Sequence, residues 1–529
     1  MSDSRLIGGS IGSRGGRGGH CGGEDGEHGE RGERGERGER GHRGHRGPRG
    51  PQGPAAPLVP FVPPFPEVVP TIITIFARQR GSDETGTGSF EEPFRTFQRA
   101  IRQVPNVIAP GFAYIVDVTD LGVEMFPAGY QIPPFQATVQ TYLFLDPSTA
   151  PFVVLAALNI RAFPKPFEAL PPADTVVPAG DIVAITTVGP GLTSVQVAPP
   201  RASWAANGAL TAMVIGDGGD AQVNSVVFAS DATHLFLTNT PDHVAVQQLS
   251  LVEPSAVFAS EGPGSDGPGW QSSEAESLAI QGIKFTIPGG GTDSQVALGI
   301  ANTLQPFIEL SDIDGLGLFG VALQGLTLAS VVRGFAAIQG AAWSPRRSLV
   351  LNAGLNFTGG FGQTFRQTVV DGSSPVGPGS FATGEPGNPP AGWELLNVLI
   401  QNGTGPGVNA FGDGVYSLEQ VEIDDCVGDG ILAADPISVK LDRVTGVGNL
   451  LLGLRAEDGA QVRVIDDATN ITGIQGDLKA GVQPIRTWVN FRTVAPVKNE
   501  LDVVSPPIGD ETSGAGTGGT SLSRIFQRP

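Results

Sequence analysis

The stretch IQNGTGPGV at residues 400–408 returns in altered form as IDDCVGDGI at 423–431 and as LDRVTGVGN at 441–449. A shorter copy, IDDATN, fills 465–470, and the unequal intervals between the copies suit rungs whose loops differ in length. Each copy begins with an apolar residue that suits the inside of a strand, and glycines that suit a corner follow in the first three. Repeats of this kind are typical of solenoids, in which each rung buries the apolar face of the next. We therefore expect stacked rungs over residues 276–500, with corner glycines at Gly405, Gly428 and Gly446.

The composition agrees with a turn-rich β protein. Gly accounts for 76 and Pro for 44 of the 529 residues, and only 16% are charged. Residues 111–275 contain strand-like runs without a firm period, so they are either early rungs with long insertions or a separate β-domain. Residues 501–529 have the composition of a mostly flexible tail.

Upstream of the repeats, the stretch GSDETGTGSFEEPFRTFQRAI occupies residues 81–101. Ser89 and Glu92 stand at the spacing of a helix capping box, and apolar residues recur at helical spacing from Phe94 onwards. The pattern predicts a short amphipathic helix over about 93–103. Because repeat folds need covered ends, we expect the segment 76–110 to cap the stack.

This stretch resembles the segment that precedes the first rung in right-handed parallel β-helix proteins of the pectate-lyase-like superfamily. The positions that carry the resemblance are Gly81, Asp83, Gly86, Gly88, Ser89, Pro93, Phe94, Thr96, Gln98, Ala100 and Ile101. The resemblance implies an all-β fold, a right-handed parallel β-helix with an N-terminal capping helix. It implies no particular chemistry, because function lives in the site and not in the fold.

A second repeat, with a period of three, lies near the N-terminus. Glycine occupies every third position, at Gly23, Gly26, Gly29, Gly32, Gly35, Gly38, Gly41, Gly44, Gly47, Gly50 and Gly53. Only glycine fits the crowded axis of a collagen triple helix, so residues 23–55 are predicted to form a collagen-like stalk and the chain a homotrimer. The segment resembles bacterial and phage collagen-like proteins. The alternative is a disordered linker rich in Gly, Arg and Glu.

The stalk is flanked by segments of different character. Residues 1–22 form a Gly- and Arg-rich tail that we expect to be flexible, and residues 56–75 form a Pro-rich linker. The two cysteines of the chain cannot provide a disulfide framework. A weak candidate metal cluster at the start of the stalk consists of His20, Cys21 and His28.

Candidate catalytic residues lie in the repeats, where aspartates occur in pairs: Asp424 with Asp425, and Asp466 with Asp467. Stacked rungs would bring one carboxylate of each pair to about 5 Å, the separation in a retaining glycosidase. Asp442 and Arg443 on the intervening copy would add an acid and a cation. The alternative is that these aspartates make corner hydrogen bonds or face solvent.

The family resemblance sharpens this choice. Hydrolases of the superfamily carry a Gly-His-Gly motif, whereas this chain has Gly428-Asp429-Gly430. Lyases of the superfamily use Ca²⁺ held by aspartates, so Ca²⁺ is expected only if the chain is a lyase, and no other cofactor is expected. We therefore lean towards a protein that is not an enzyme.

Charge and hydrophobicity restrict the partners. The formal net charge of −20 argues against nucleic acid. The uncharged run 315–332 is long enough for a membrane span, but its glycine-separated apolar pairs predict short strands. The sequence MSDSRLIGGS has no apolar core of a cleavable signal peptide.

Two functions remain as expectations. The first is a homotrimeric structural or adhesive fibre at an extracellular surface or on a virus particle, with a β-helix body that binds glycans. The alternative is a polysaccharide lyase or glycoside hydrolase that acts on acidic or extended glycans.

Overall fold

The computed structural model divides the chain into two compact units, 1–66 and 67–529. The described residues all lie in the second: 71–127, 129–137, 143–144, 154–207, 210–217, 223–238, 248–260, 268–273, 277–287, 296–301, 306–314, 321–322, 325–333, 343–351, 363–372, 381–383, 391–403, 405–410, 414–433, 437–456, 460–465, 470–473, 476–480, 488–491, 508–510 and 524–527. The predicted stalk over 23–55, the candidate metal cluster and the Asp466–Asp467 pair lie outside the described residues.

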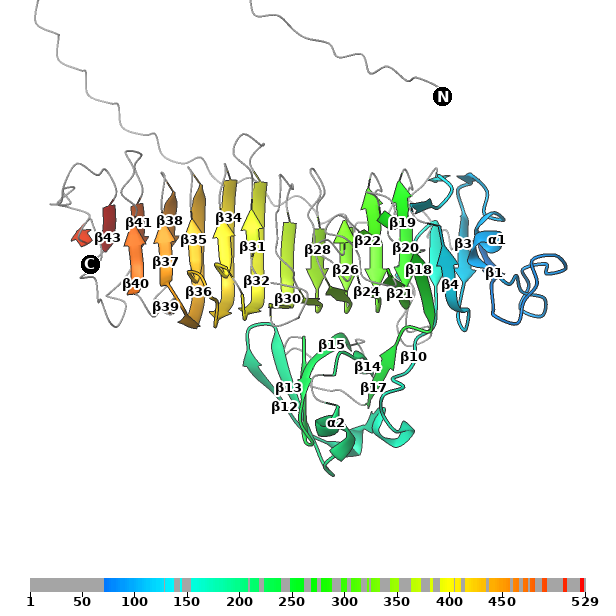
Figure 1. Cartoon of the computed structure of the whole chain (residues 1–529), viewed down its shortest axis with the longest axis horizontal. Helices are drawn as coiled ribbons and strands as arrows, with labels where there is room; N and C mark the ends of the chain where they lie inside the picture. Colours follow the sequence, from blue (N-terminus) through cyan, green and yellow to red (C-terminus); the bar gives the residue numbers. More distant parts are fainter. Residues whose placement is uncertain are drawn as a thin grey trace, which may run out of the picture. The chain divides into compact units, whose positions relative to one another are not determined.

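The described part of the chain is mostly β-structure, and its largest sheet has 22 strands that pair only in parallel. The strands stack in three faces, and one passage of the chain through the faces is called a rung below (Figure 1). The first face contains β1 (Thr71–Phe76), β3 (Phe112–Asp117), β9 (Leu158–Arg161), β20 (Leu278–Gln281), β23 (Phe307–Glu309), β26 (Gly325–Leu328), β28 (Trp343–Arg346), the first halves of β30 (Gln363–Asp371), β32 (Ala391–Gln401), β34 (Gly414–Asp424) and β36 (Ser438–Asn449), and then β38 (Gln461–Val464), β41 (Trp488–Phe491), β42 (Ile508–Asp510) and β43 (Arg524–Gln527).

The other two faces are equally regular. The second contains β4 (Gly122–Phe126), β18 (Ala256–Ser260), β21 (Ile283–Thr286), β24 (Asp312–Asp314), β27 (Val331–Arg333), β29 (Leu349–Leu351), the second halves of β30, β32, β34 and β36, and β39 (Asn470–Gly473). The third contains β5 (Tyr130–Gln131), β19 (Pro268–Ser273), β22 (Val296–Ala301) and β25 (Val321–Ala322), and, in a separate sheet, β31 (Phe381–Thr383), β33 (Val408–Ala410), β35 (Ile431–Ala433), β37 (Leu452–Ala456) and β40 (Gly476–Ala480). Short pairs are β2 (Val107–Ile108) with β6 (Gln136–Ala137), and β7 (Leu143–Phe144) with β8 (Val154–Leu155).

This all-parallel arrangement is consistent with a parallel β-helix. One continuous apolar core runs between the faces, from Ile75 in β1 to Ile471 in β39. Its first rungs are filled with aromatic rings, and the ring centroids of Phe126 and Phe258 lie 5.0 Å apart. The uncharged run 315–332 contributes β25, β26 and β27, as the sequence predicted. In the described part of the chain, no helix is long and apolar enough to cross a membrane.

The corner between the first and second faces repeats one backbone conformation. A single left-handed residue separates the two faces in successive rungs, with φ between 46° and 54° at Leu310, Ala329, Arg347, Gln367, Asn397, Gln420 and Arg443. Most L-residues avoid this region, so the stacking of neighbouring rungs must impose it.

A ladder of buried hydroxyl groups, called the hydroxyl ladder below, follows these corner residues at Ser311, Ser330, Ser348 and Thr368. The backbone N–H of Ser311 donates to the Oγ of Ser330 at 3.2 Å, and that of Ser330 donates to the Oγ of Ser348 at 3.3 Å. Each hydroxyl also donates to the carbonyl two residues earlier. The ladder thus links backbone groups of one rung to the next where the chain turns.

The helix is shorter than the sequence predicted. Helix α1 spans Phe97–Ile101 and is capped by the Thr96 side chain, which accepts from the N–H of Arg99. It begins late because Phe94 is held by backbone hydrogen bonds to Phe76 and Arg78. The prediction that Ser89 caps the helix is wrong, since its hydroxyl accepts from the N–H of Glu92 in the preceding turn.

Residues of the 81–101 stretch hold this turn against the helix. The Asp83 carboxylate accepts hydrogen bonds from the N–H groups of Arg95 and Thr96 and from the Thr96 hydroxyl, at 2.8–3.1 Å. A Cβ at Gly81 or Gly86 would overlap backbone carbonyls, among them that of Pro93. The stretch therefore has a local structural role here, which is to fold the chain tightly before the first rung.

An antiparallel domain, called the inserted domain below, interrupts the rungs between β9 and β18. The region 111–275, for which the sequence left two possibilities open, thus contains both early parallel strands and an inserted sheet. The sheet contains β10 (Lys165–Pro166), β11 (Val176–Pro178), β12 (Ile182–Gly189), β13 (Leu192–Val197), β14 (Met213–Asp217), β15 (Val223–Ser230), β16 (His234–Leu237) and β17 (Gln248–Glu253). Its helical turns are η1 (Pro172–Asp174), η2 (Ala179–Asp181) and α2 (Ala202–Ala206).

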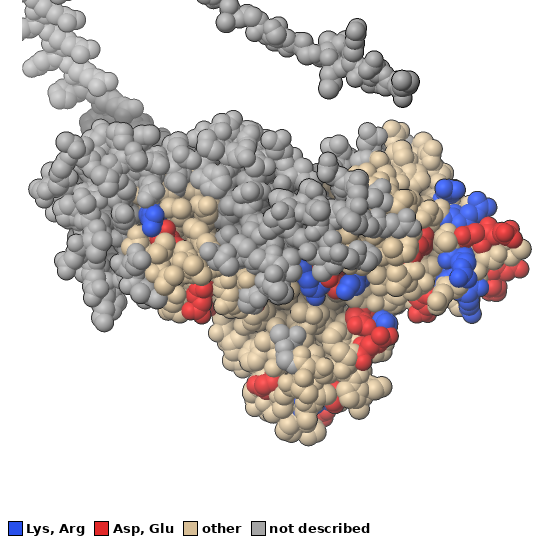
Figure 2. Space-filling view, in the orientation of Figure 1, with Lys and Arg blue, Asp and Glu red and all other residues tan. Residues whose placement is uncertain are grey.

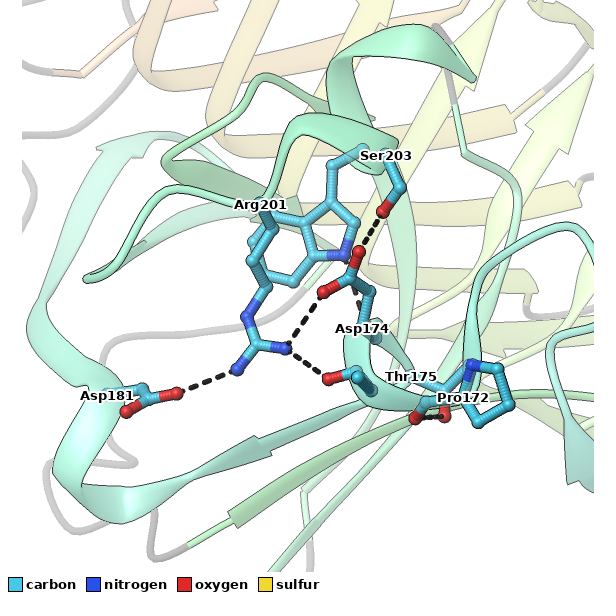
Figure 3. Close-up of polar contacts among 8 residues, drawn as sticks. Pro172, Asp174, Thr175, Asp181, Arg201 and Ser203 are labelled. Carbon is cyan, nitrogen blue, oxygen red and sulfur yellow. Dashed lines mark hydrogen bonds and ion pairs between the residues drawn. The ribbon is translucent and has the colours of Figure 1, made fainter.

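A buried arginine joins the three helical turns of the inserted domain (Figure 3). The guanidinium of Arg201 lies 2.7 Å from the Asp181 carboxylate and 3.4 Å from that of Asp174. Asp174 also accepts a hydrogen bond from Ser203, and the guanidinium lies 5.5 Å from the ring centre of Trp204. The cluster compensates the buried charge and fixes α2 against both short helices.

The inserted domain packs on the rungs along the corner column. Val226 shares an apolar cluster with Val331, Leu349, Val369 and Leu399 of the second face. On the first-face side, the Nδ2 of Asn224 donates to Oε1 of the buried Glu309 at 2.6 Å. In the view of Figure 2, charged groups gather at the first rungs and where the inserted domain meets the stack, and most other described surface is uncharged.

Candidate functional site

The candidate site lies on the outer side of the second face, at the end of β34. Val421 and Ile423 point into the core and are fully buried, so the alternation of a strand places Glu422 and Asp424 outside. Two carboxyl groups thus stand side by side on one surface. We call Glu422 and Asp424 the carboxylate pair.

The environment of the carboxylate pair raises the pKa of one of its members, Glu422. Burial, the negative charge of Asp424 and a hydrogen bond with Asp424 raise the pKa of Glu422 from 4.5 to about 7. The Asp424 carboxylate accepts a hydrogen bond from the backbone N–H of Val447 at 2.9 Å. Near neutral pH the carboxyl group of Glu422 is therefore partly protonated.

The inserted domain supplies part of this burial. At the β12–β13 turn, a Cβ on Gly189 would lie 3.1 Å from Oε2 of Glu422. Gly191 has φ +65° and would place a Cβ 2.5 Å from the carbonyl oxygen of Asn397. The turn therefore leaves no room for a Cβ at Gly191 and little at Gly189, and it covers one side of the carboxylate pair.

Further polar groups continue the surface along the stack. Asp371, Gln401 and Asp424 are aligned in β30, β32 and β34 by the strand register. The Nδ2 of Asn402 donates to the Asp371 carboxylate at 3.0 Å. Neighbouring strands lie about 4.8 Å apart, so Asp371 and Asp424 are separated by about 10 Å along the row. Asp371 is buried and Gln401 and Asp424 are half-buried, so the last two are the accessible groups of the row.

Among the described residues, the structure places Asp442 and Arg443 away from the Asp424–Asp425 pair. Asp425 is a corner residue with φ +54°, next to Asp424. Asp442 and Arg443 lie at the other corner, on the first-face side, where the Arg443 guanidinium contacts the Glu419 carboxylate at 2.6 Å. They are therefore not stacked on Asp424 and Asp425.

Asp442 and Arg443 lie away from the predicted position because the sequence alignment of the third repeat copy was wrong. The register pairs Ile400 with Ile423, as the first two copies predict, and the N–H of Gly428 donates to the carbonyl of Gly405. The third copy is misaligned, because its first residue, Leu441, pairs with Leu418 and not with Ile423. Gly446 lies instead beside Ile423, whose carbonyl a Cβ at Gly446 would overlap.

The fourth copy is misaligned as well. The register pairs Leu441 with Val464, so Ile465 is not the partner that the repeat predicted. The predicted pairings of Leu441 with Ile423 on one neighbouring rung and with Ile465 on the other were therefore both wrong. Only the pairing of the first copy with the second is confirmed.

Sequence reasoning missed Glu422 and Asp371. The alternation Val-Glu-Ile-Asp at 421–424 was a usable signal, because it places two acids on the face opposite two core residues. Cys426, two positions beyond Asp424, is buried, and burial raises the pKa of its thiol to about 11. It is therefore not an activated nucleophile.

Metal ligands do not gather in the part of the chain that the structure describes. It contains no group of three or more His, Cys, Asp or Glu side chains placed to hold an ion. His234 lies 3.0 Å from the Asp231 carboxylate in a tight turn of the inserted domain, where Asp231 also accepts from the N–H of Thr233. The Thr233 hydroxyl also lies 3.0 Å from Nδ1 of His234, and these local contacts close the turn.

Comparisons with known proteins give no family for the chain. No family model matches, and no curated protein matches. Among solved structures, the tailspike protein gp49 from Pseudomonas phage LKA1 aligns with a TM-score of 0.32 and 12% identity, covering 75% of this chain and 73% of that one. XylC in complex with xylose aligns with a TM-score of 0.19 and 8% identity, covering 86% and 83%. Such low TM-scores carry no argument about this chain.

Proposed function

We propose that the protein is a homotrimeric fibre or surface appendage whose rungs bind polysaccharide, located at a cell surface or on a virus particle. The observation that carries the proposal is the in-register parallel stack, whose outer sides present aligned polar groups such as Gln401 and Asp424. Regular rows of this kind suit an extended polymer with repeated hydroxyl groups. The run of Gly-X-Y triplets in the sequence supports the trimer.

The proposal includes the finer description of the fold. The stack would be the right-handed helix of the pectate-lyase-like superfamily, and α1 would cap its core. Support comes from Phe97 of α1, which is buried and lies 5.0 Å from the ring centre of Phe258. The structural roles of Asp83, Gly81 and Gly86 in the turn before α1 agree with this assignment.

The trimer is tested by light scattering on the full chain. We expect three times the chain mass of 54.6 kDa. Gly38→Ala, in the middle of the triplets, is expected to lower the temperature at which the trimer dissociates, because no Cβ fits the triple-helix axis. Gln52→Ala, at an outward position of the same triplets, is the control and should leave that temperature unchanged. A monomeric wild-type chain contradicts the proposed trimer.

A second candidate function, polysaccharide cleavage, is favoured by the carboxylate pair. A carboxyl group with a pKa of about 7 is suited to general acid catalysis, and a second carboxyl group lies beside it. Glu422 would protonate the leaving oxygen, and Asp424 would stabilise developing positive charge or activate water. A Ca²⁺-dependent lyase is the other form of this candidate, and Ca²⁺ enters only there.

The cleavage reaction is tested by incubating the full chain with a panel of neutral and acidic polysaccharides and measuring new reducing ends. If Glu422 is the general acid, Glu422→Gln is expected to lower the rate by at least about 100-fold. Asp425→Asn is the matched control, because Asp425 is exposed at the corner and lies outside the carboxylate pair. Equal rates for Glu422→Gln and wild type contradict this candidate.

A further inference from the structure

A second surface, on the first face, has the opposite charge. Trp343 and Phe365 point into the core, so the alternating residues Arg346 and Arg366 stand on the outer side of β28 and β30. The strand register places the two arginines directly opposite each other on neighbouring rungs. Neighbouring strands lie about 4.8 Å apart, so two positive charges are held close together.

This placement is unfavourable without a partner, because like charges that face each other across strands repel. Glu394 compensates one charge, since its Oε2 lies 3.0 Å from Nη2 of Arg366. Arg347, at the corner, donates to Gln367 at 3.2 Å and acts electrostatically on Glu309, two rungs away. Burial and the charge of Arg366 lower the pKa of Arg346.

Apolar groups flank the two arginines in the same row. The register aligns Leu328 with Arg346 on one side and Arg366 with Leu396 on the other, and both leucines are partly exposed. Met213 and Ile215 of the inserted domain pack beside Leu328 and so border the row. The row therefore presents two guanidinium groups between apolar side chains, at the foot of the inserted domain.

We propose that Arg346 and Arg366 bind an anionic sugar unit of a polysaccharide, through its carboxylate or sulfate oxygens. The inference rests on the proposed function and adds the class of polymer. Guanidinium groups present planar pairs of donors that match both anions, and the apolar neighbours suit the C–H face of a sugar ring. A bound anion also removes the repulsion between the two arginines.

The test measures binding of the full chain to three polymers by biolayer interferometry: polygalacturonate for carboxylates, dextran sulfate for sulfates and dextran as the neutral reference. We expect binding to at least one anionic polymer that weakens with added salt. Arg346→Gln and Arg366→Gln are each expected to weaken that binding about tenfold. Arg443→Gln is the matched control, because Glu419 and Asp442 already pair with that arginine.

Stability provides a second, independent measurement. If the arginines form a site that a ligand completes, Arg346→Gln removes a repulsion and keeps or raises the melting temperature of the free protein. A lower melting temperature, with binding unchanged, overturns the proposal and makes the pair structural. Binding to dextran alone overturns the anionic class while leaving the proposed function standing, and binding to none of the three polymers contradicts both.

Discussion

The rungs and the inserted domain are stabilised by different kinds of contact. In the rungs, each strand pairs in parallel with the same position one turn away, and a left-handed corner residue recurs from Leu310 to Arg443. In the inserted domain, antiparallel strands close around a compact core, and Arg201 joins its helical turns through two carboxylates. The rungs are thus stabilised by repetition, and the inserted domain by a few unique contacts.

This difference predicts where single substitutions act. In a repetitive stack, an atom added where two rungs lie close together clashes with the backbone of the neighbouring rung. That rung is itself held by the next one, so the clash cannot be relieved locally. In a compact domain, an error at one buried cluster loosens that domain and leaves the stack intact. The two regions are therefore expected to respond to different kinds of change.

The largest effect is expected for Gly428→Ala in the rungs. A Cβ there would overlap the backbone of Gly405 and Pro406 on the neighbouring rung, so both rungs must separate. We expect the free energy of unfolding to fall by more than about 3 kcal/mol, measured by urea denaturation followed by circular dichroism. Gly180→Ala in the inserted domain is the control, because nothing lies within 4 Å of the added carbon. Equal midpoints for the two variants contradict the account of the rungs.

The pairing of the rungs around Gly428 was predicted correctly from the sequence. The first two repeat copies predicted the pairing of Ile400 with Ile423 and the stacking of Gly405 on Gly428, because both copies keep an Ile at the same inward position. The third copy failed because Gly446 occupies that inward position, where Ile471 and Asn449 approach it. Matching glycines to glycines therefore placed Leu441 where Gly446 belongs, which moved Asp442 and Arg443 to the wrong corner.

Two other features had no local signal. Nothing in the sequence marks where the chain leaves the rungs after β9 and returns at β18, because the apolar strands of both regions look alike. The carboxylate pair could be predicted only in part, since Asp424 stood in a repeat and Glu422 did not. The pKa of Glu422 is raised by burial, and the β12–β13 turn supplies part of that burial through a contact between residues far apart in the chain.

The second-largest effect is expected for Arg201→Met in the inserted domain. The substitution leaves the carboxylates of Asp174 and Asp181 without their cation, and breaking a buried ion pair in this way costs about 3 kcal/mol. Hydrogen exchange measured by mass spectrometry should increase across 165–253 and remain unchanged in β32 and β34. Lys165→Met is the control, because its ion pairs with Glu168 and Glu253 are accessible to solvent and contribute below about 1 kcal/mol. Faster exchange throughout the rungs would show that the two regions unfold as one.

A smaller effect is expected from the hydroxyl ladder. Ser330→Ala removes the acceptor of the Ser311 N–H, which then lies buried without its partner, at a cost of about 1–2 kcal/mol. Urea denaturation measures the loss. Ser344→Ala, on the half-buried outer side of β28, is the control and should change stability by less than about 0.5 kcal/mol. If the two variants unfold alike, the ladder contributes nothing beyond packing.

The last prediction concerns pH and compares two carboxyl groups at different rungs. Burial raises the pKa of Glu124 from 4.5 to about 7, although the N–H groups of Phe97 and Gln98 donate to it. Because the pKa is higher in the folded state, its contribution to stability is fully present below pH 4.5 and is lost as the pH rises through about 7. The same sign holds for Glu422.

Melting temperatures measured from pH 4 to pH 8 should therefore fall less steeply above pH 4.5 in Glu124→Gln than in wild type. Gln keeps an oxygen that can accept from Phe97, so the helix contact survives while the titration is removed. Glu422→Gln should flatten the profile less, because Glu422 is half-buried while Glu124 is 8% exposed. A steeper profile in Glu124→Gln contradicts the sign of the pKa shift. A larger effect at Glu422 would mean that the inserted domain shields Glu422 from solvent more strongly than the first rungs shield Glu124.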